Sequence, residues 1–235
     1  MAEIDYESLL KKPEDESIKE RIGRACTHNI DKTACFYHVI TKSNDGGVIF
    51  HQDSGDYRHS LLCRFCEEEG VTILFSVTMP SHTHDVFLTP SWEALAEVMR
   101  KVNLYVTKYL RRKNPKKYRQ AIRIIRRYPA YIPIRDIVAL FVCGKYVYDN
   151  PDYLRVDGKF IPHICFWMFE KEYFPAAYDG SIYRKLFGLS PRDILQLFST
   201  RTARQVLDYA KEHFRDWTPQ RTKAVFFRKD DSDCS

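Results

Sequence analysis

The sequence lacks any apolar run long enough to cross a bilayer. Its first residues include Glu3, Asp5 and Glu7 and contain no apolar stretch of the kind found in signal peptides. The 7 cysteines have no regular spacing, so they do not indicate a disulfide framework, and they suit a reducing compartment. We therefore expect a soluble, cytoplasmic protein with no membrane partner.

Acidic residues are absent between Glu97 and Asp136, although basic residues are frequent there. A solvated helix face normally mixes both signs of charge, so binding of a polyanion explains this interval better than an ordinary charged surface does. The basic residues that we expect to contact a nucleic acid backbone are Arg111, Arg112, Lys113, Lys116, Lys117, Arg123, Arg126 and Arg127.

A His-x-His pair follows a break between two predicted strands. Residues 71–77 are rich in β-branched and aromatic side chains, Pro80 interrupts them, and residues 82–88 predict a second strand. Residues two apart in a strand point to the same face, so His82 and His84 can share one metal ion. The spacing alone is a weak pattern, because two such histidines are also compatible with a half-exposed polar strand.

A helix is predicted over residues 134–150, and it carries a candidate nucleophile near its end. Tyr146 and Asn150 are four residues apart and therefore share one helix face. A tyrosine beside a metal-bound phosphate can attack phosphorus and form a covalent intermediate. Tyr148 is an alternative nucleophile, but it lies about 200° around the helix from Tyr146, so both cannot face the same metal.

Taken together, these segments resemble the single-tyrosine HUH transposases, and most closely the REP-associated tyrosine transposases. The motifs that carry the resemblance are Met79–His84 (MPSHTH) and Lys145–Pro151 (KYVYDNP). Residues 36–41 resemble the first strand of that family. Residues 183–184 and 197–199 resemble its C-terminal part.

The resemblance implies a metal-dependent enzyme that nicks and rejoins single DNA strands through a phosphotyrosine intermediate. His82 and His84 would hold Mg²⁺ or Mn²⁺, Asn150 would be the third polar group at the metal, and Tyr146 would attack a DNA phosphate. The implied partner is single-stranded or hairpin DNA, in the cytoplasm and associated with the nucleoid. The oligomeric state stays open between a monomer and a homodimer.

Three residues depart from the usual family motif. Ser81 replaces Asn, Thr83 replaces Val, and Asp85 stands where the family has an apolar residue. These changes motivate a rival interpretation, a non-catalytic DNA- or RNA-binding regulatory protein on the same fold. A zinc protein built on Cys63 and Cys66 is a further rival, although structural cysteines explain this CxxC better in the absence of a second one.

The order strand, helix, strand, strand, helix, strand predicts an α+β, ferredoxin-like (RRM-like) fold, with an antiparallel sheet, helices on one face and a helical C-terminal extension. We expect a charged extension over residues 1–33, a transposase-like catalytic domain over 34–180, a helical part over 181–217 and a disordered tail over 218–235.

Overall fold

The computed structural model describes residues 31–150, 155–156, 159–160, 165–167, 181–214 and 226. The main sheet contains β1 (Phe36–Lys42), β2 (Thr72–Thr78), β3 (His82–Leu88), β4 (Ala130–Ile134) and β7 (Cys165–Trp167). A second pair of strands is formed by β5 (Arg155–Val156) and β6 (Lys159–Phe160). The helices are α3 (Gln52–Glu68), α4 (Trp92–Lys113), α5 (Pro115–Tyr118), α6 (Ile137–Asp149), α7 (Ser181–Phe187), α8 (Pro191–Thr200) and α9 (Ala203–His213).

The main sheet has the strand order β4-β1-β3-β2-β7, and its neighbouring strands pair antiparallel. The first four strands and the helices α3 and α4 follow the chain order of a ferredoxin-like unit. The predicted fold class is therefore confirmed, and β7 adds a short strand to the β2 edge.

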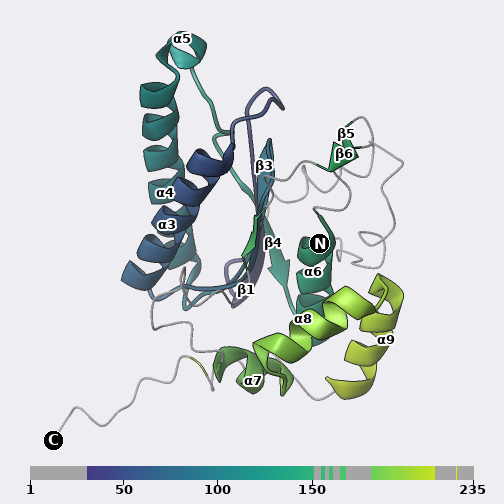
Figure 1. Cartoon of the computed structure of the whole chain (residues 1–235). Coiled ribbons are helices and arrows are strands. Elements are labelled where there is room, and N and C mark those ends of the chain that lie inside the picture. The colour runs from purple at the N-terminus through teal and green to yellow at the C-terminus, as the bar shows by residue number, and fades with distance from the viewer. Residues whose placement is uncertain are drawn as a thin grey trace, which may run out of the picture.

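Helices cover both faces of this sheet (Figure 1), which corrects the expectation that, apart from the C-terminal extension, they lie on one face. On one face, α3 and α4 bury a core that includes Tyr37, Ile73 and Phe87. On the other face, α6 and the C-terminal helices α7–α9 pack over Phe75 and Val86. The tyrosine helix α6 thus lies opposite the two helices of the ferredoxin-like unit, and the helical C-terminal extension continues the layer that it begins.

Some predicted boundaries are corrected by local hydrogen bonds. Helix α3 begins at Gln52, four residues before the start at Asp56 that its apolar pattern predicts, because the Ser54 hydroxyl accepts a hydrogen bond from the His51 backbone at the helix start. Helix α6 begins at Ile137 rather than residue 134. The carboxylate of Asp136 accepts a hydrogen bond from Ala139 N at 2.7 Å and caps the first turn.

Several expectations concern residues outside the described part of the chain. The charged extension over 1–30, most of the aromatic-rich segment over 152–178 and nearly all of the tail after residue 214 lie there. The division into four parts therefore stays a prediction. Among the described helices, none is both long and apolar enough to span a membrane.

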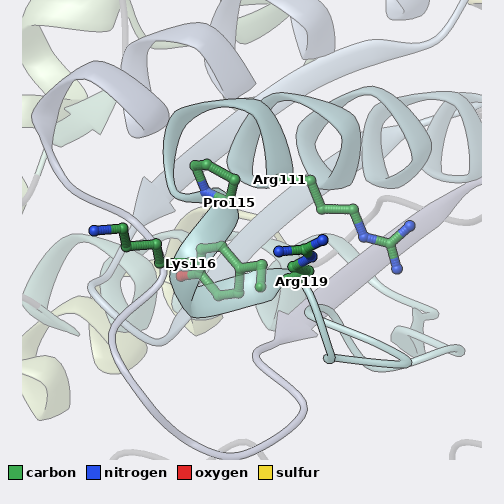
Figure 2. A pocket seen from close by; sticks show the side chains of 5 residues that line it. Arg111, Pro115, Lys116 and Arg119 are labelled. Carbon is green, nitrogen blue, oxygen red and sulfur yellow. The ribbon is translucent and has the colours of Figure 1, made fainter.

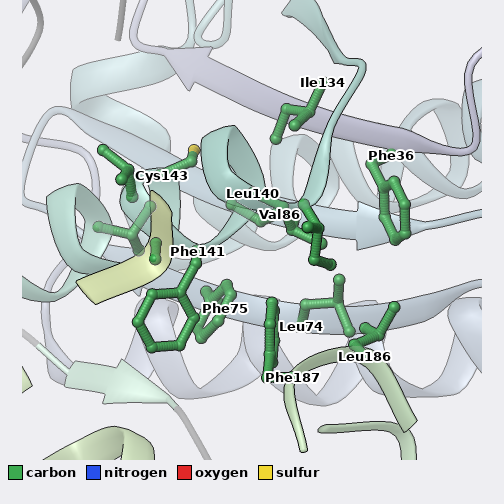
Figure 3. Close-up of a cluster of buried hydrophobic side chains, with 14 of the residues drawn as sticks. Phe36, Leu74, Phe75, Val86, Ile134, Leu140, Phe141, Cys143, Leu186 and Phe187 are labelled. Atoms are coloured by element: carbon green, nitrogen blue, oxygen red, sulfur yellow. The ribbon is translucent and has the colours of Figure 1, made fainter. Parts of the chain in front are cut away.

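The tyrosine helix approaches the sheet closely at a glycine. A Cβ atom at Gly144 would lie 2.7 Å from the Phe75 ring, so only glycine fits this contact without rearrangement. Phe75, Phe141 and Phe187 fill the space between β2, α6 and α7 (Figure 3). A β-bulge in β2 shifts the ladder between Ile73 and Phe75, and Tyr183 of α7 donates a hydrogen bond to Leu74 O at 2.6 Å. These contacts hold α6 and α7 against the histidine-bearing sheet.

Candidate active site

The turn before the histidines is fixed by backbone hydrogen bonds from the segment that follows β1. The backbone N–H of Ser43 donates to Ser81 O at 2.8 Å, and those of Ile49 and Phe50 both donate to Pro80 O at 2.9 Å. Strand β3 then begins at His82. Because the turn is held by three donors, the first residues of β3 have a defined position and direction.

His82 and His84 lie on the same face of β3, and Tyr146 of α6 reaches them. The two histidine ring centroids are 5.0 Å apart. The Tyr146 ring meets the His84 ring edge to face, with a centroid distance of 5.4 Å. The structure therefore brings together the two predicted metal ligands and the predicted nucleophile within one chain.

A third histidine, His38 of β1, belongs to this cluster and was not among the predicted site residues. Its Nε2 lies 2.9 Å from His84 Nδ1, and its ring lies 5.9 Å from that of Tyr146. In the β1–β3 ladder His84 pairs with Ile40 and His38 pairs with Val86, so the two rings meet on the diagonal. We call His38, His82, His84 and Tyr146 the histidine–tyrosine cluster.

Burial keeps the three histidines of this cluster neutral. Desolvation lowers the pKa of His38 to about 3 and that of His82 to about 4, where the positive charge of Lys42 adds a smaller effect. The pKa of His84 falls well below its usual value, first through burial and then through its neighbours His38, His82 and Lys42. Neutral imidazole is the form that binds a metal, so the lowered pKa values suit His82 and His84 as metal ligands.

Lys42 is a second residue that sequence reasoning missed. It ends β1 directly opposite His82 in the ladder, shares a strand face with His38, and is exposed. The alternation of side chains along β1 is enough to predict that Lys42 shares a face with His38. Its position beside His82 depends on the register between β1 and β3, which the sequence does not give. A cation at this position can attract a DNA phosphate toward the histidines.

The two tyrosines of α6 have different surroundings. Tyr146 faces the histidines, whereas the Tyr148 ring packs 5.8 Å from that of Phe198 in α8. Between them, Lys145 is buried, with its Nζ 2.6 Å from Asp149 Oδ1 and 2.7 Å from Phe198 O. These contacts fix the orientation of α6 about its own axis, with Tyr146 directed toward β3.

Asn150 lies at the end of the same helix but is not joined to the histidines by a hydrogen bond in the described part of the chain. Its Nδ2 donates to Tyr146 O at 3.2 Å, and the residue is buried. The amide oxygen of Asn150 is the atom left to act as a ligand.

The donor set partly fits the predicted divalent metal. Two neutral imidazoles on one strand provide two ligands, but the described residues contain no group of three or more His, Cys, Asp or Glu side chains arranged to hold a metal ion. Such a pair suits an open catalytic site, in which substrate oxygens and water complete the coordination. Imidazole favours Mn²⁺ or a later transition metal over Mg²⁺.

The opposite face of β3 carries a buried polar network centred on Asp85. The carboxylate of Asp85 pairs with Arg58 of α3 at 2.5 Å, and both side chains are almost completely buried. Ser76 and Thr83 donate hydrogen bonds to the same carboxylate at 2.7 and 3.0 Å. Asp85 faces away from the histidines, and two departures from the family motif, Thr83 and Asp85, are partners in this network.

Cys63 and Cys66 are buried thiols within α3. Burial raises the pKa of Cys63 to about 12 and that of Cys66 well above its usual value. Cys63 Sγ lies 3.4 Å from His59 Nε2. A buried position with raised thiol pKa values is typical of structural cysteines.

The predicted basic residues are all exposed and gather where α4 ends. Helix α4 is about 33 Å long, whereas a seven-residue strand spans about 23 Å, so α4 extends beyond the sheet. Arg111, Lys116 and Arg119 line a pocket of about 700 Å³ around Pro115 and Tyr118 (Figure 2). Arg119 is an addition to the predicted set.

The remaining predicted basic residues lie near this pocket or on the chain that leads back to the sheet. Lys113 pairs with Asp53, and Lys117 donates to Val48 O at 3.1 Å. The Arg126 backbone N–H donates to Lys42 O at 2.9 Å, which brings the basic segment to the end of β1 beside His82.

A known protein family matches part of the chain. The family model described as "Transposase IS200 like" matches residues 31–130. This region includes the histidine pair and the first three strands of the sheet, and it ends before α6. The resemblance to this transposase family is thus confirmed over residues 31–130.

No curated protein matches the sequence. Among solved structures, the chain is similar to the "REP associates tyrosine transposase bound to a REP hairpin", with 15% identity and a TM-score of 0.41. The match covers 53% of this chain and 72% of that one. The fold class rests on the strand order described above.

Proposed function

We propose that this protein is a metal-dependent transposase that cleaves and rejoins single DNA strands, with Tyr146 as the nucleophile. The observation that carries the proposal is the contact between Tyr146 and His84, whose ring centroids are 5.4 Å apart. His84 lies within residues 31–130, which match the transposase family model, and Tyr146 lies beyond them. A tyrosine beside a metal-binding pair is an arrangement that supports phosphoryl transfer to the tyrosine hydroxyl.

In this proposal His82 and His84 hold a divalent ion, Mn²⁺ or Mg²⁺, and the amide oxygen of Asn150 is an additional ligand. The metal supplies charge that polarises the scissile phosphate and stabilises its transition state. Lys42, on the same strand face, attracts the phosphate and offsets its charge.

The Tyr146 oxygen forms a bond to phosphorus, and the bond from phosphorus to the 3′ oxygen breaks. The tyrosine proton is lost to solvent, and the departing 3′ oxygen takes up a proton to become a free hydroxyl. A 3′ hydroxyl of a second strand then attacks the phosphotyrosine and reverses these steps. The bond energy is retained, so joining needs no nucleotide cofactor.

The expected substrate is single-stranded or hairpin DNA, since the nucleophile reaches a phosphodiester most easily where bases are unpaired. The exposed basic residues on α4, α5 and the segment up to Arg127 supply the backbone contacts. Such an enzyme works where the DNA is, in the cytoplasm at the nucleoid.

The rival proposal, a non-catalytic binding protein, was motivated by three departures from the family motif. Thr83 and Asp85 belong to a network on the opposite face, and the Ser81 hydroxyl lies 3.1 Å from His82 Nδ1. None of the three displaces the histidine pair from Tyr146, so the departures give the rival little support.

The test is a cleavage assay on single-stranded hairpin DNA with Mn²⁺ or Mg²⁺, analysed on a denaturing gel. Wild type and Tyr148→Phe should form a covalent protein–DNA adduct, whereas Tyr146→Phe should not. If wild type binds a broad set of hairpins but forms no adduct, the non-catalytic binding protein is the better description. Competition with matched RNA hairpins then separates DNA from RNA binding.

A further inference from the structure

Each histidine of the proposed metal pair is held through its Nδ1 atom. His84 Nδ1 lies 2.9 Å from His38 Nε2, and His82 Nδ1 lies 3.1 Å from Ser81 Oγ. Within the described residues, neither Nε2 atom has a hydrogen-bond partner. The two rings are therefore fixed in the same way by two unrelated partners, one from β1 and one from the turn before β3.

We infer that His38 and Ser81 are positioning residues that hold His84 and His82 as Nδ1–H tautomers, so that both Nε2 atoms bind the divalent metal. This inference rests on the proposed function in one respect, which is that the histidine pair is the metal site. It adds that the Nε2 atoms are the ligands and that His38 and Ser81 determine this choice of nitrogen.

In neutral imidazole one ring nitrogen carries a proton and the other a lone pair. A ring that donates from Nδ1 presents its lone pair at Nε2. Ser81 Oγ can accept the His82 proton directly. His38 can accept the His84 proton only when its own proton is on Nδ1.

The opposite arrangement would block the site. If His38 donated from Nε2 to His84 Nδ1, the His84 proton would move to Nε2, where it would exclude a metal. The Nδ1 atom of His38 is buried without a hydrogen-bond partner in the described part of the chain. Metal binding at His84 therefore requires His38 to keep its proton on Nδ1, where the N–H is buried without a partner. This costs free energy, which the interaction of His84 with the metal offsets.

The first experiment measures Mn²⁺ binding by calorimetry without DNA. His38→Leu removes the acceptor and should weaken Mn²⁺ binding about 10- to 100-fold, the usual effect of losing a residue that orients a metal ligand. His38→Gln has an amide oxygen that can accept the same proton and should keep most of the affinity. Ser81→Ala should weaken binding less, because the serine is partly exposed and water can replace it.

Thr83→Val is the matched control, since it changes a neighbouring residue of the same strand on the opposite face. It should leave Mn²⁺ affinity unchanged. Each variant is also melted, because a purely structural role for His38 predicts a lower Tm with unchanged metal affinity of the folded protein. A folded His38→Leu variant that binds Mn²⁺ as tightly as wild type overturns the inference.

The second experiment reads the tautomers in wild type by long-range ¹H–¹⁵N NMR with saturating Mg²⁺, so it does not depend on variants that fold. We expect Nδ1–H on His82, His84 and His38. A proton on His84 Nε2 overturns the inference. If His84→Ala binds Mn²⁺ as well as wild type, the proposed metal site itself is wrong. If wild type binds metal through the histidines but forms no adduct, the tautomer assignment stands and only the tyrosine chemistry fails.

Discussion

The two faces of strand β3 carry polar residues for different purposes. On one face His82 and His84 meet Tyr146, and their Nε2 atoms have no hydrogen-bond partner in the described chain. On the other face Asp85 is satisfied by Arg58, Ser76 and Thr83. A polar network whose members satisfy one another stabilises the fold, whereas a polar cluster that keeps ligand atoms available is suited to binding.

The strongest test of this difference compares neighbouring residues of β3. His84→Ala should lower adduct formation more than about 100-fold, since it removes a ligand rather than a residue that orients one. Thr83→Val should leave the adduct yield close to wild type. Initial rates on the same hairpin DNA measure both. If both variants lowered the rate of adduct formation equally, the reaction would depend on the integrity of β3 and not on its histidine face.

Breaking the network on the opposite face should affect stability. Asp85→Ala leaves the buried Arg58 charge unpaired and should lower the free energy of unfolding by about 3–5 kcal/mol in urea titrations. Replacing both partners, as in Arg58→Met with Asp85→Val, should recover most of this loss because no buried charge remains. If the double variant is as unstable as the single one, the ion pair is not the source of the effect.

Acid should destabilise the metal-free protein through histidines on both sides of the sheet. Burial lowers the pKa of His38 and His59 to about 3 and that of His82 to about 4, from 6.5. Below pH 6.5 the unfolded chain therefore binds protons that the folded chain takes up only near pH 3–4. Stability should fall as the pH drops through this window, by up to about 1.4 kcal/mol per pH unit for each histidine.

Urea titrations at several pH values measure this slope. His59→Gln changes a histidine of α3, and His38→Gln changes one of the histidine–tyrosine cluster, so each should make the slope shallower. A constant free energy of unfolding between pH 6.5 and 4 would contradict the account of neutral buried histidines.

The smallest expected effect is on DNA affinity and concerns the basic residues at the end of α4. This helix packs on the face of the sheet opposite the histidines, and we propose that its end also contacts DNA. Lys116→Ala should leave Tm unchanged and reduce the slope of log affinity against log salt by about 0.7 for single-stranded DNA, the loss of one phosphate contact. Arg192→Ala on α8 is the control and should leave the slope unchanged. Fluorescence anisotropy at several salt concentrations provides the measurement.

Strand and helix periodicity predicted on which faces the candidate residues lie, whereas the resemblance to the transposase family selected them as a site. The two-residue repeat placed His82 and His84 on one face and Asp85 on the other, and the helical repeat separated Tyr146 from Tyr148. His38, Lys42 and Arg58 escaped prediction because their roles depend on which strands pair and in which register. A single sequence does not specify that register, since it is set by packing of the whole sheet.

The central claim, that Tyr146 is the nucleophile at the histidine face, is tested most directly by mapping the DNA attachment. The covalent adduct is digested with nuclease and protease, and the modified peptide is sequenced by mass spectrometry. Residues 146 and 148 lie on the same peptide, so fragmentation must separate them. We predict a nucleotide on Tyr146 alone. Attachment to Tyr148, or to a tyrosine outside α6, would contradict the account.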